Sequence, residues 1–208
     1  MDRYVKSIEL LMNIEDTGVD VCLVSKYWAD SDIMKFYQAG FRKFGESRID
    51  ALIRRAQNFP KDIEWHFIGN IQSRDIGKIC KYAKIIQSFD RPDLLAKLVN
   101  YPDIEILVQV NISGQNNRNG VLVSDLDKVI EEIEKYEVTC NGFMIHPPLD
   151  SSIEDKKHWF EEMQRIFSNY PNYTVLSMGT SHDFELANEF GATLNRLGRI
   201  LLGKQPLD

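Results

Sequence analysis

The sequence is poor in cysteine and lacks both a strongly basic segment and a long apolar run. Its 208 residues include three cysteines, Cys22, Cys80 and Cys140, whose odd number and wide separation indicate neither a disulfide framework nor a metal cluster. Lysine and arginine total 25 against 31 acidic residues, and this net charge of −6 argues against nucleic acid as a partner. Without a run of about 18 apolar residues or an apolar signal core, we expect a cytoplasmic protein with no membrane span.

Short apolar segments alternate with helical patterns along the whole chain. An amphipathic helix at residues 2–13 comes first, and eight strand-like segments follow, separated by helical patterns. The strand-like segments cover residues 21–26, 41–46, 63–69, 84–89, 104–111, 138–145, 173–177 and 192–197. Alternating β and α units form parallel sheets, and eight of them favour a closed barrel over an open doubly wound sheet. The sequence therefore predicts an α/β fold, a single (β/α)8 TIM barrel domain over residues 1–208 with an extra N-terminal helix. Loss of two strands would restore the open-sheet alternative.

The first strand-like segment ends on a lysine. The apolar run V-C-L-V-S is followed by Lys26, and then by the aromatic residues Tyr27 and Trp28. If Lys26 points into the mouth of the barrel, it is a cation at the edge of a dry face. Partial desolvation lowers the pKa of a lysine amine, and a neutral amine can attack an aldehyde to form a Schiff base. The alternative is a lysine that has simply reached solvent.

The functional site of such a barrel lies at the C-terminal ends of its strands. Two segments there contain glycine and polar residues, S-M-G-T-S at 177–181 and R-L-G-R at 196–199. Loops in these two positions commonly bind phosphate, and Gly179 and Gly198 would allow close backbone approach. The hydroxyl of Ser181 can donate a hydrogen bond to the same anion, and this role is compatible with that of N-cap of the following helix, which is the simpler interpretation. A phosphate site opposite a lysine suggests a phosphorylated aldehyde, with pyridoxal 5′-phosphate (PLP) as the candidate.

Seven motifs occur in an order and spacing that resemble a known family. They are V-S-K at 24–26, F-G-E at 44–46, E-W-H-F-I-G with I-Q-S at 64–73, V-Q-V-N at 108–111, G-F-M at 142–144, L-S-M-G-T-S at 176–181 and R-L-G at 196–198. Together they resemble the YggS/PROSC-like family of PLP homeostasis proteins, which is similar to the N-terminal barrel domain of alanine racemase. The resemblance covers nearly the whole chain.

The resemblance implies a set of cofactor-binding residues. They are Lys26, Met144, Ser181, Arg196, Gly198 and Arg199. In this reading Lys26 forms the Schiff base, and Arg196 lies near the pyridine nitrogen. Because an arginine does not give up its proton, it keeps that nitrogen neutral and the ring a poorer electron sink than a carboxylate partner would.

The chain departs from the family pattern at a few positions. Ser47 stands where the family usually has asparagine, and Arg74 with Asp75 where it has Asn-Lys. Arg199 replaces the usual threonine, which puts one hydroxyl contact to the phosphate in doubt. The effect of these departures on cofactor affinity is left open by the sequence.

The four histidines are assigned no chemistry. His66 lies in a strand between two aromatic residues, which is typical of a hydrogen-bonded core or rim histidine. His158 and His182 fall on helical segments and are expected to be solvated, and His146 follows a strand. No two of them have the spacing of metal ligands, so we expect no bound metal.

These observations favour a PLP-binding protein that acts in intracellular PLP homeostasis as a monomer, with PLP-dependent apoenzymes as possible partners. We expect no catalytic residue, because the sequence holds no further segment to place an acid or base on the second face of the cofactor. One alternative is a PLP-dependent enzyme of low, racemase-like activity on amino acids. Another is an aldolase-type barrel that forms a Schiff base with a phosphorylated sugar.

Overall fold

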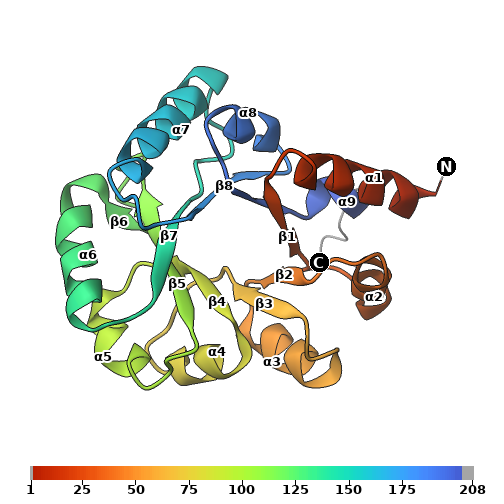
Figure 1. Cartoon of the computed structure of the whole chain (residues 1–208), viewed down its shortest axis with the longest axis horizontal. Coiled ribbons are helices and arrows are strands. Elements are labelled where there is room, and N and C mark those ends of the chain that lie inside the picture. Colours follow the sequence, from red (N-terminus) through yellow and green to blue (C-terminus); the bar gives the residue numbers. More distant parts are fainter. Residues whose placement is uncertain (1, 203–208) are drawn as a thin grey trace.

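Eight parallel strands close into a barrel in the computed structural model, which describes residues 2–202 (Figure 1). The barrel strands are β1 (Asp20–Val24), β2 (Lys43–Glu46), β3 (Glu64–Phe67), β4 (Ile85–Phe89), β5 (Glu105–Asn111), β7 (Cys140–Ile145), β8 (Val175–Thr180) and β9 (Leu194–Leu197). Neighbours in the chain are neighbours in the barrel, and the β1–β9 and β4–β5 pairs complete the ring. The predicted TIM barrel is confirmed, and every predicted strand is present.

Helices surround the barrel on its outer side. They are α1 (Arg3–Glu15), α2 (Asp30–Gln38), α3 (Ile49–Asn58), α4 (Ile76–Tyr82), α5 (Leu95–Leu98), α6 (Leu126–Lys135), α7 (Ile153–Phe167), α8 (Phe184–Glu189) and α9 (Arg199–Leu202), with 3₁₀ turns at Pro92–Leu94 and Val123–Asp125. The predicted N-terminal helix corresponds to α1, which packs on β1 and α9, and Ser7 of α1 donates a hydrogen bond to the carbonyl of Leu201. The short helix α9 was not predicted.

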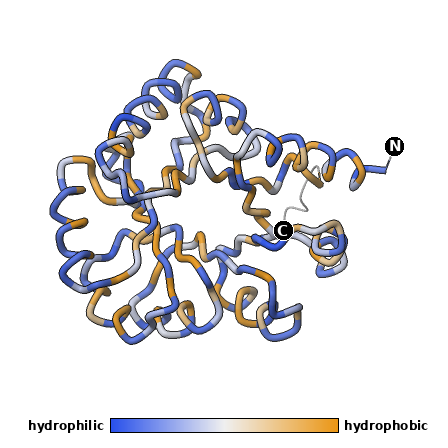
Figure 2. Tube along the Cα trace, viewed as in Figure 1, coloured by the Kyte–Doolittle hydropathy of each residue, from blue (hydrophilic) through white to orange (hydrophobic). Residues whose placement is uncertain are grey.

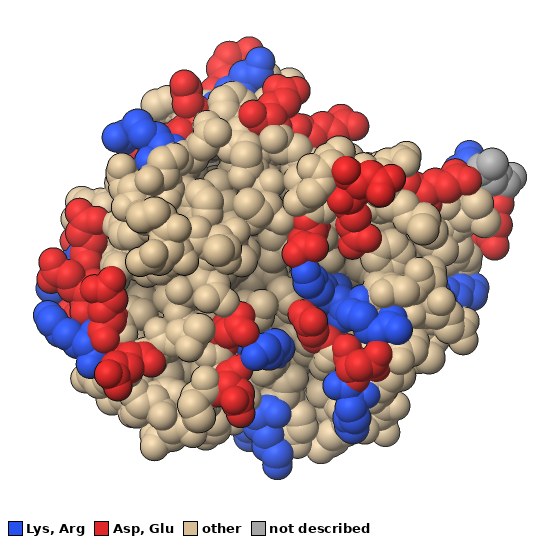
Figure 3. Space-filling view, in the orientation of Figure 1, with Lys and Arg blue, Asp and Glu red and all other residues tan. Residues whose placement is uncertain are grey.

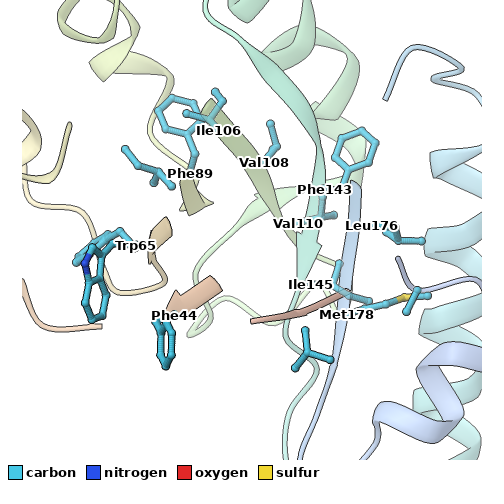
Figure 4. Close-up of a cluster of buried hydrophobic side chains, with 14 of the residues drawn as sticks. Phe44, Trp65, Phe89, Ile106, Val108, Val110, Phe143, Ile145, Leu176 and Met178 are labelled. Carbon is cyan, nitrogen blue, oxygen red and sulfur yellow. The ribbon is translucent and has the colours of Figure 1, made fainter. Parts of the chain in front are cut away.

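The main hydrophobic core lies between the barrel and its helices. Hydrophobic residues concentrate on the strands and on the helix sides that face them, while the outer sides of the helices are hydrophilic (Figure 2). Alternate strand residues such as Phe44, Phe143 and Leu176 are fully buried and point toward the helix layer (Figure 4). Phe143, for example, contacts the aromatic rings of Phe167 and Tyr170. Because side chains alternate along a strand, the other half of the strand residues fill the barrel interior.

Several predicted boundaries are wrong near the C-terminal ends of the strands, among them that of β3, which stops at Phe67 and not at residue 69. β1 stops at Val24, because the carbonyl of Ser25 accepts a hydrogen bond from the amide of Trp28 instead of continuing the ladder. The segment 177–180 belongs to β8 and not to the loop after it. Ser181 is not the cap of the next helix, since α8 begins at Phe184. A two-residue strand, β6 (Val121–Leu122), was also missed; it pairs with the end of β5.

The surface carries both signs of charge. On the face seen in Figure 3, acidic and basic side chains are interspersed around the rim. Among the described residues, no helix is both long and apolar enough to cross a membrane.

Candidate cofactor site

A buried arginine lies at the centre of the candidate site. Arg196 of β9 stands beside Cys22 of β1, and its side chain enters the barrel interior with 6% of the residue exposed. Nη1 donates to the carbonyl and the Oγ of Ser177 at 2.9 and 2.7 Å, and Nη2 donates to the carbonyl of Ile145 at 2.8 Å. None of the ion pairs found among residues 2–202 includes Arg196. Its charge is therefore held in place by neutral oxygens alone.

Desolvation dominates the electrostatics of this guanidinium. Burial lowers the pKa of Arg196 to about 10, an effect that the neighbouring Cys22 and Asp183 oppose. The group still carries its proton at neutral pH. A buried cation without a carboxylate partner is costly to the fold, which makes its position a candidate for binding an anion or a lone pair.

A row of neutral polar side chains continues from Arg196 across the barrel interior. Ser177 accepts from Arg196 and donates to Oε1 of Gln87 at 2.7 Å. The amide nitrogen of Gln87 lies 2.6 Å from Nδ1 of His66. Since Gln87 donates to Nδ1, the ring proton of His66 is assigned to Nε2, which has no hydrogen-bond partner among the described residues. Burial lowers the pKa of His66 to about 3, so the row ends in a neutral imidazole.

The row confirms one sequence expectation and adds a residue that was missed. His66 is the buried, hydrogen-bonded histidine that its aromatic neighbours predicted. Gln87 was not singled out, although it interrupts the apolar run I-I-Q-S-F of β4. A long polar side chain in the middle of a buried strand was the available signal for an inward-facing group.

Lys26 lies in the turn just beyond β1. Its side chain is half-buried, and Nζ sits over the ring of Tyr27 at 4.9 Å from the centroid. Because β1 pairs with β9, the lysine follows the strand next to the one that carries Arg196. Met144 on β7 stands opposite Ser177 in the register and is buried, so it lines the interior on the other side of Arg196.

The proposed phosphate segment is built around Ser181. Its Oγ accepts hydrogen bonds from the amides of Gly198 at 3.3 Å and Ile200 at 3.1 Å, at the start of α9. The serine thus contacts the free amides after β9 and not those of α8. Backbone amides at this position are the groups that bind phosphate in many barrels.

Gly198 is required for a reason that the sequence did not reveal. A Cβ added there would lie 2.6 Å from the carbonyl oxygen of Val24. The glycine therefore allows β9 to pack closely on β1, which also brings the amides after it next to the turn of Lys26.

Arg199 is exposed, and its Nη1 lies 3.1 Å from Nε2 of His182. The side chain is therefore at the edge of the phosphate segment and not inside it. His146 follows β7, and partial enclosure, together with the cations Arg196 and Arg118, lowers its pKa to about 4. Within the described part of the chain, no group of three or more His, Cys, Asp or Glu side chains is placed to hold a metal ion.

Comparison with known proteins gives a consistent result. The model of the alanine racemase N-terminal domain matches residues 8–206. A pyridoxal phosphate homeostasis protein of Aquifex aeolicus is 31% identical over 185 residues, 83% of this chain and 81% of the relative. The protein of the same name from Schizosaccharomyces pombe is 30% identical over 200 residues, 89% of this chain and 84% of the relative.

Solved structures share the same architecture. PipY of Synechococcus elongatus with PLP bound superimposes with a TM-score of 0.83 at 26% identity, covering 95% of this chain and all of PipY. An alanine racemase of Bartonella henselae gives a TM-score of 0.75 at 18% identity, covering 97% of this chain and 60% of the racemase. At 18% identity, the likeness to the racemase shows that the two chains share a fold and nothing further.

Proposed function

Because this chain belongs to the pyridoxal phosphate homeostasis protein family and carries the alanine racemase N-terminal domain, we propose that it binds PLP at the C-terminal mouth of the barrel. The cofactor would be held there for intracellular PLP homeostasis. When bound, PLP supplies a reactive aldehyde and an electron-accepting ring.

The observation that carries this proposal is the unpaired, buried guanidinium of Arg196. It is fixed by three hydrogen bonds to neutral oxygens and retains further N–H donors. Such a donor suits the lone pair of a pyridine nitrogen. It keeps its own proton because its pKa, although lowered to about 10, stays well above neutral pH.

Lys26 is the proposed covalent anchor. Its amine would bond to the aldehyde carbon that PLP supplies when bound, with the aldehyde oxygen and the two amine hydrogens released as one water molecule. This lysine follows Val24, whose carbonyl lies close to Gly198, which supports the proposal that one ligand meets both the amine and the amides.

The phosphate would be bound by the amides of Gly198 and Ile200 and by the hydroxyl of Ser181. In the structure the hydroxyl oxygen accepts hydrogen bonds from these two amides. It would rotate to donate to the anion when phosphate is present, because a serine hydroxyl both accepts and donates. Arg199 stands at the edge of this segment and would contribute less than the backbone.

We propose binding without classical turnover. Three titratable groups near Arg196 have shifted pKa values. Burial raises the pKa of the Cys22 thiol to about 12, and the pKa values of the His66 and His146 imidazoles are lowered to about 3 and about 4. None of the three exchanges protons readily at neutral pH, so none suits the role of an acid or base on the cofactor. The proposed working state is a cytoplasmic monomer that passes PLP to apoenzymes.

An absorbance spectrum of the purified protein tests the proposal. Protein incubated with PLP and desalted should retain the absorbance of PLP bound to a lysine, and Lys26→Ala should lose that band. Lys43→Ala is the matched control, because Lys43 pairs with Asp20 at the start of the strands and lies away from the mouth. A band that survives Lys26→Ala and disappears in Lys43→Ala would overturn the assignment.

The absence of turnover is tested separately. We expect the PLP-loaded protein to racemise L-alanine no faster than free PLP at the same concentration, as followed by chiral chromatography. A rate well above that of free PLP would favour the alternative of a low-activity enzyme.

A further inference from the structure

The turn that carries Lys26 is attached to helix α3 by one buried arginine. Arg55 has 4% of its surface exposed. Its Nη1 donates to the carbonyl of Ser25 at 2.8 Å, and its Nη2 donates to the carbonyl of Trp28 at 2.6 Å. These two carbonyls flank Lys26 and Tyr27. A single planar guanidinium therefore holds both ends of the turn.

Arg55 is itself fixed by two carboxylates. Nη1 also contacts Oε1 of the fully buried Glu46, and Nε lies 3.2 Å from Oδ1 of Asp30. The same Glu46 oxygen accepts a hydrogen bond from Oγ of Ser25 at 2.7 Å. The carboxylate thus contacts both the arginine and the first residue of the turn, so the three side chains form one connected cluster.

A buried charge pair of this kind is weak evidence for stability, because desolvation of the two charges offsets much of their attraction. Apolar side chains between β2 and α3 would fill the same space at lower cost. What the cluster provides, and apolar groups cannot, is directional hydrogen bonds to two chosen backbone carbonyls.

The turn has one backbone hydrogen bond of its own, from the amide of Trp28 to the carbonyl of Ser25, and the strand does not extend into it. β1 ends at Val24, so the backbone of Lys26 has no ladder partner. From these observations we propose that Arg55, held by Glu46, is a positioning residue that sets the direction of Lys26 toward the aldehyde of PLP. The inference rests on the proposed role of Lys26 as the covalent anchor.

The expected consequence is a selective one. Loosening the turn lowers the effective concentration of the amine at the aldehyde, and displacements of about 1 Å can slow a positioned reaction by roughly a hundredfold. The phosphate segment at Ser181 and Gly198 follows two other strands, β8 and β9, and is held by hydrogen bonds of its own. Covalent capture should therefore weaken while binding of the phosphate and ring is kept.

Three variants separate positioning from a general structural role. The double variant Arg55→Met/Glu46→Gln removes the guanidinium without leaving a buried carboxylate unpaired. Arg55→Lys keeps the charge beside Glu46 but cannot donate to both carbonyls in the same plane. Arg54→Met is the matched control, because the neighbouring Arg54 also binds Asp30, at 2.5 and 3.1 Å, yet is exposed and contacts no carbonyl of the turn.

Two probes are used with each variant. The first is PLP, with the rate of labelling at Lys26 followed by borohydride trapping and mass spectrometry. The second is pyridoxine 5′-phosphate, which has the same ring and phosphate but no aldehyde, with its Kd measured by titration. We expect the double variant to label Lys26 at least tenfold more slowly than the wild type, while its Kd for pyridoxine 5′-phosphate changes less than threefold. Arg55→Lys should label at an intermediate rate, and Arg54→Met should match the wild type.

The outcomes are distinct. Labelling of the double variant and Arg55→Lys at the wild-type rate would overturn the inference, and so would equal losses with both probes, which indicate a structural role alone. If the wild-type protein itself is not labelled at Lys26, the proposed function fails first. Should the double variant not fold, as judged by circular dichroism, Arg55→Lys alone against Arg54→Met decides between the same results.

Discussion

Two arginines are buried within residues 2–202, and their surroundings differ. Arg55, between β2 and α3, faces the carboxylates of Glu46 and Asp30. Arg196, inside the barrel, donates only to the neutral oxygens of Ser177 and Ile145. Both side chains are fixed by hydrogen bonds, but only the first has its charge compensated by the protein.

The difference indicates different uses. A compensated guanidinium can serve as a permanent link between elements, as Arg55 does between α3 and the turn of Lys26. An uncompensated guanidinium bears a desolvation cost, seen in the pKa of Arg196 lowered to about 10, and this cost is reduced when a ligand supplies an acceptor. The second arginine is therefore the better marker of a binding site.

The largest effect is expected when the compensated arginine is removed alone. Arg55→Met leaves Glu46 buried with an unpaired charge, and the free energy of unfolding should fall by about 3–5 kcal/mol. Urea denaturation at pH 7 measures this change, with Arg54→Met expected to shift it by at most about 1 kcal/mol. If Arg55→Met lowers the free energy of unfolding as little as the control does, charge compensation does not distinguish the two buried arginines.

Removal of the uncompensated arginine should affect PLP affinity more than stability. Arg196→Met should change the free energy of unfolding little. The variant loses the hydrogen bonds of the guanidinium, but it also avoids the cost of desolvating a buried charge, and the two effects offset each other. Its affinity for PLP should weaken by roughly 2 kcal/mol, the size of a hydrogen bond from a charged donor. Fluorescence titration with PLP and urea denaturation of the same sample give both values. A large loss of stability with unchanged affinity would reverse the comparison.

The neutral row behind Arg196 predicts a pH dependence. The pKa of His66 is lowered to about 3 in the folded protein and is about 6.5 in an unfolded chain, so the unfolded state binds more protons as the pH falls through 6.5. His66 should therefore lower stability by about 1.3 kcal/mol between pH 7 and pH 5.5. His66→Gln should lose this part of the pH dependence in urea denaturation. An unchanged difference between the two pH values would mean that His66 is not held neutral.

The smallest effects are expected for two side chains of the phosphate segment. Ser181→Ala and Arg199→Thr should each weaken PLP binding by about 1 kcal/mol or less, because the backbone amides remain. Gly198→Val is expected to be much worse, through the clash with the carbonyl of Val24 and loss of the β1–β9 packing. Titrations at one fixed salt concentration compare the three variants. A greater loss of affinity for Arg199→Thr than for folded Gly198→Val would assign phosphate binding to the side chain.

The barrel could be predicted because each strand is recognisable from its local sequence, as an apolar run between helical patterns. The sequence also placed Lys26, Ser181 and Arg196 near the ends of strands, where barrels carry their sites. It could not predict the partners of these residues. Arg55 contacts a carbonyl 30 residues away, and Gln87 contacts a serine 90 residues away, and such pairs depend on the closed ring.

The helix-cap reading of Ser181 failed for a local reason. Asp183 accepts hydrogen bonds from both the amide and the hydroxyl of Thr180 and ends the turn itself, so α8 starts after it. Ser181 is then free to bind the amides that follow β9. Asp183 stands at the N-cap position of α8 without a side-chain hydrogen bond to the helix, and the sequence does not rank a serine and an aspartate two residues apart as the start of a helix.

The most direct test of the account is to locate the covalent bond to PLP. The wild-type protein is incubated with PLP, reduced with borohydride, digested and sequenced by mass spectrometry. We predict a single major modification, on Lys26. A modification found instead on another lysine, such as Lys43 or Lys78, would contradict the site described at the mouth of the barrel.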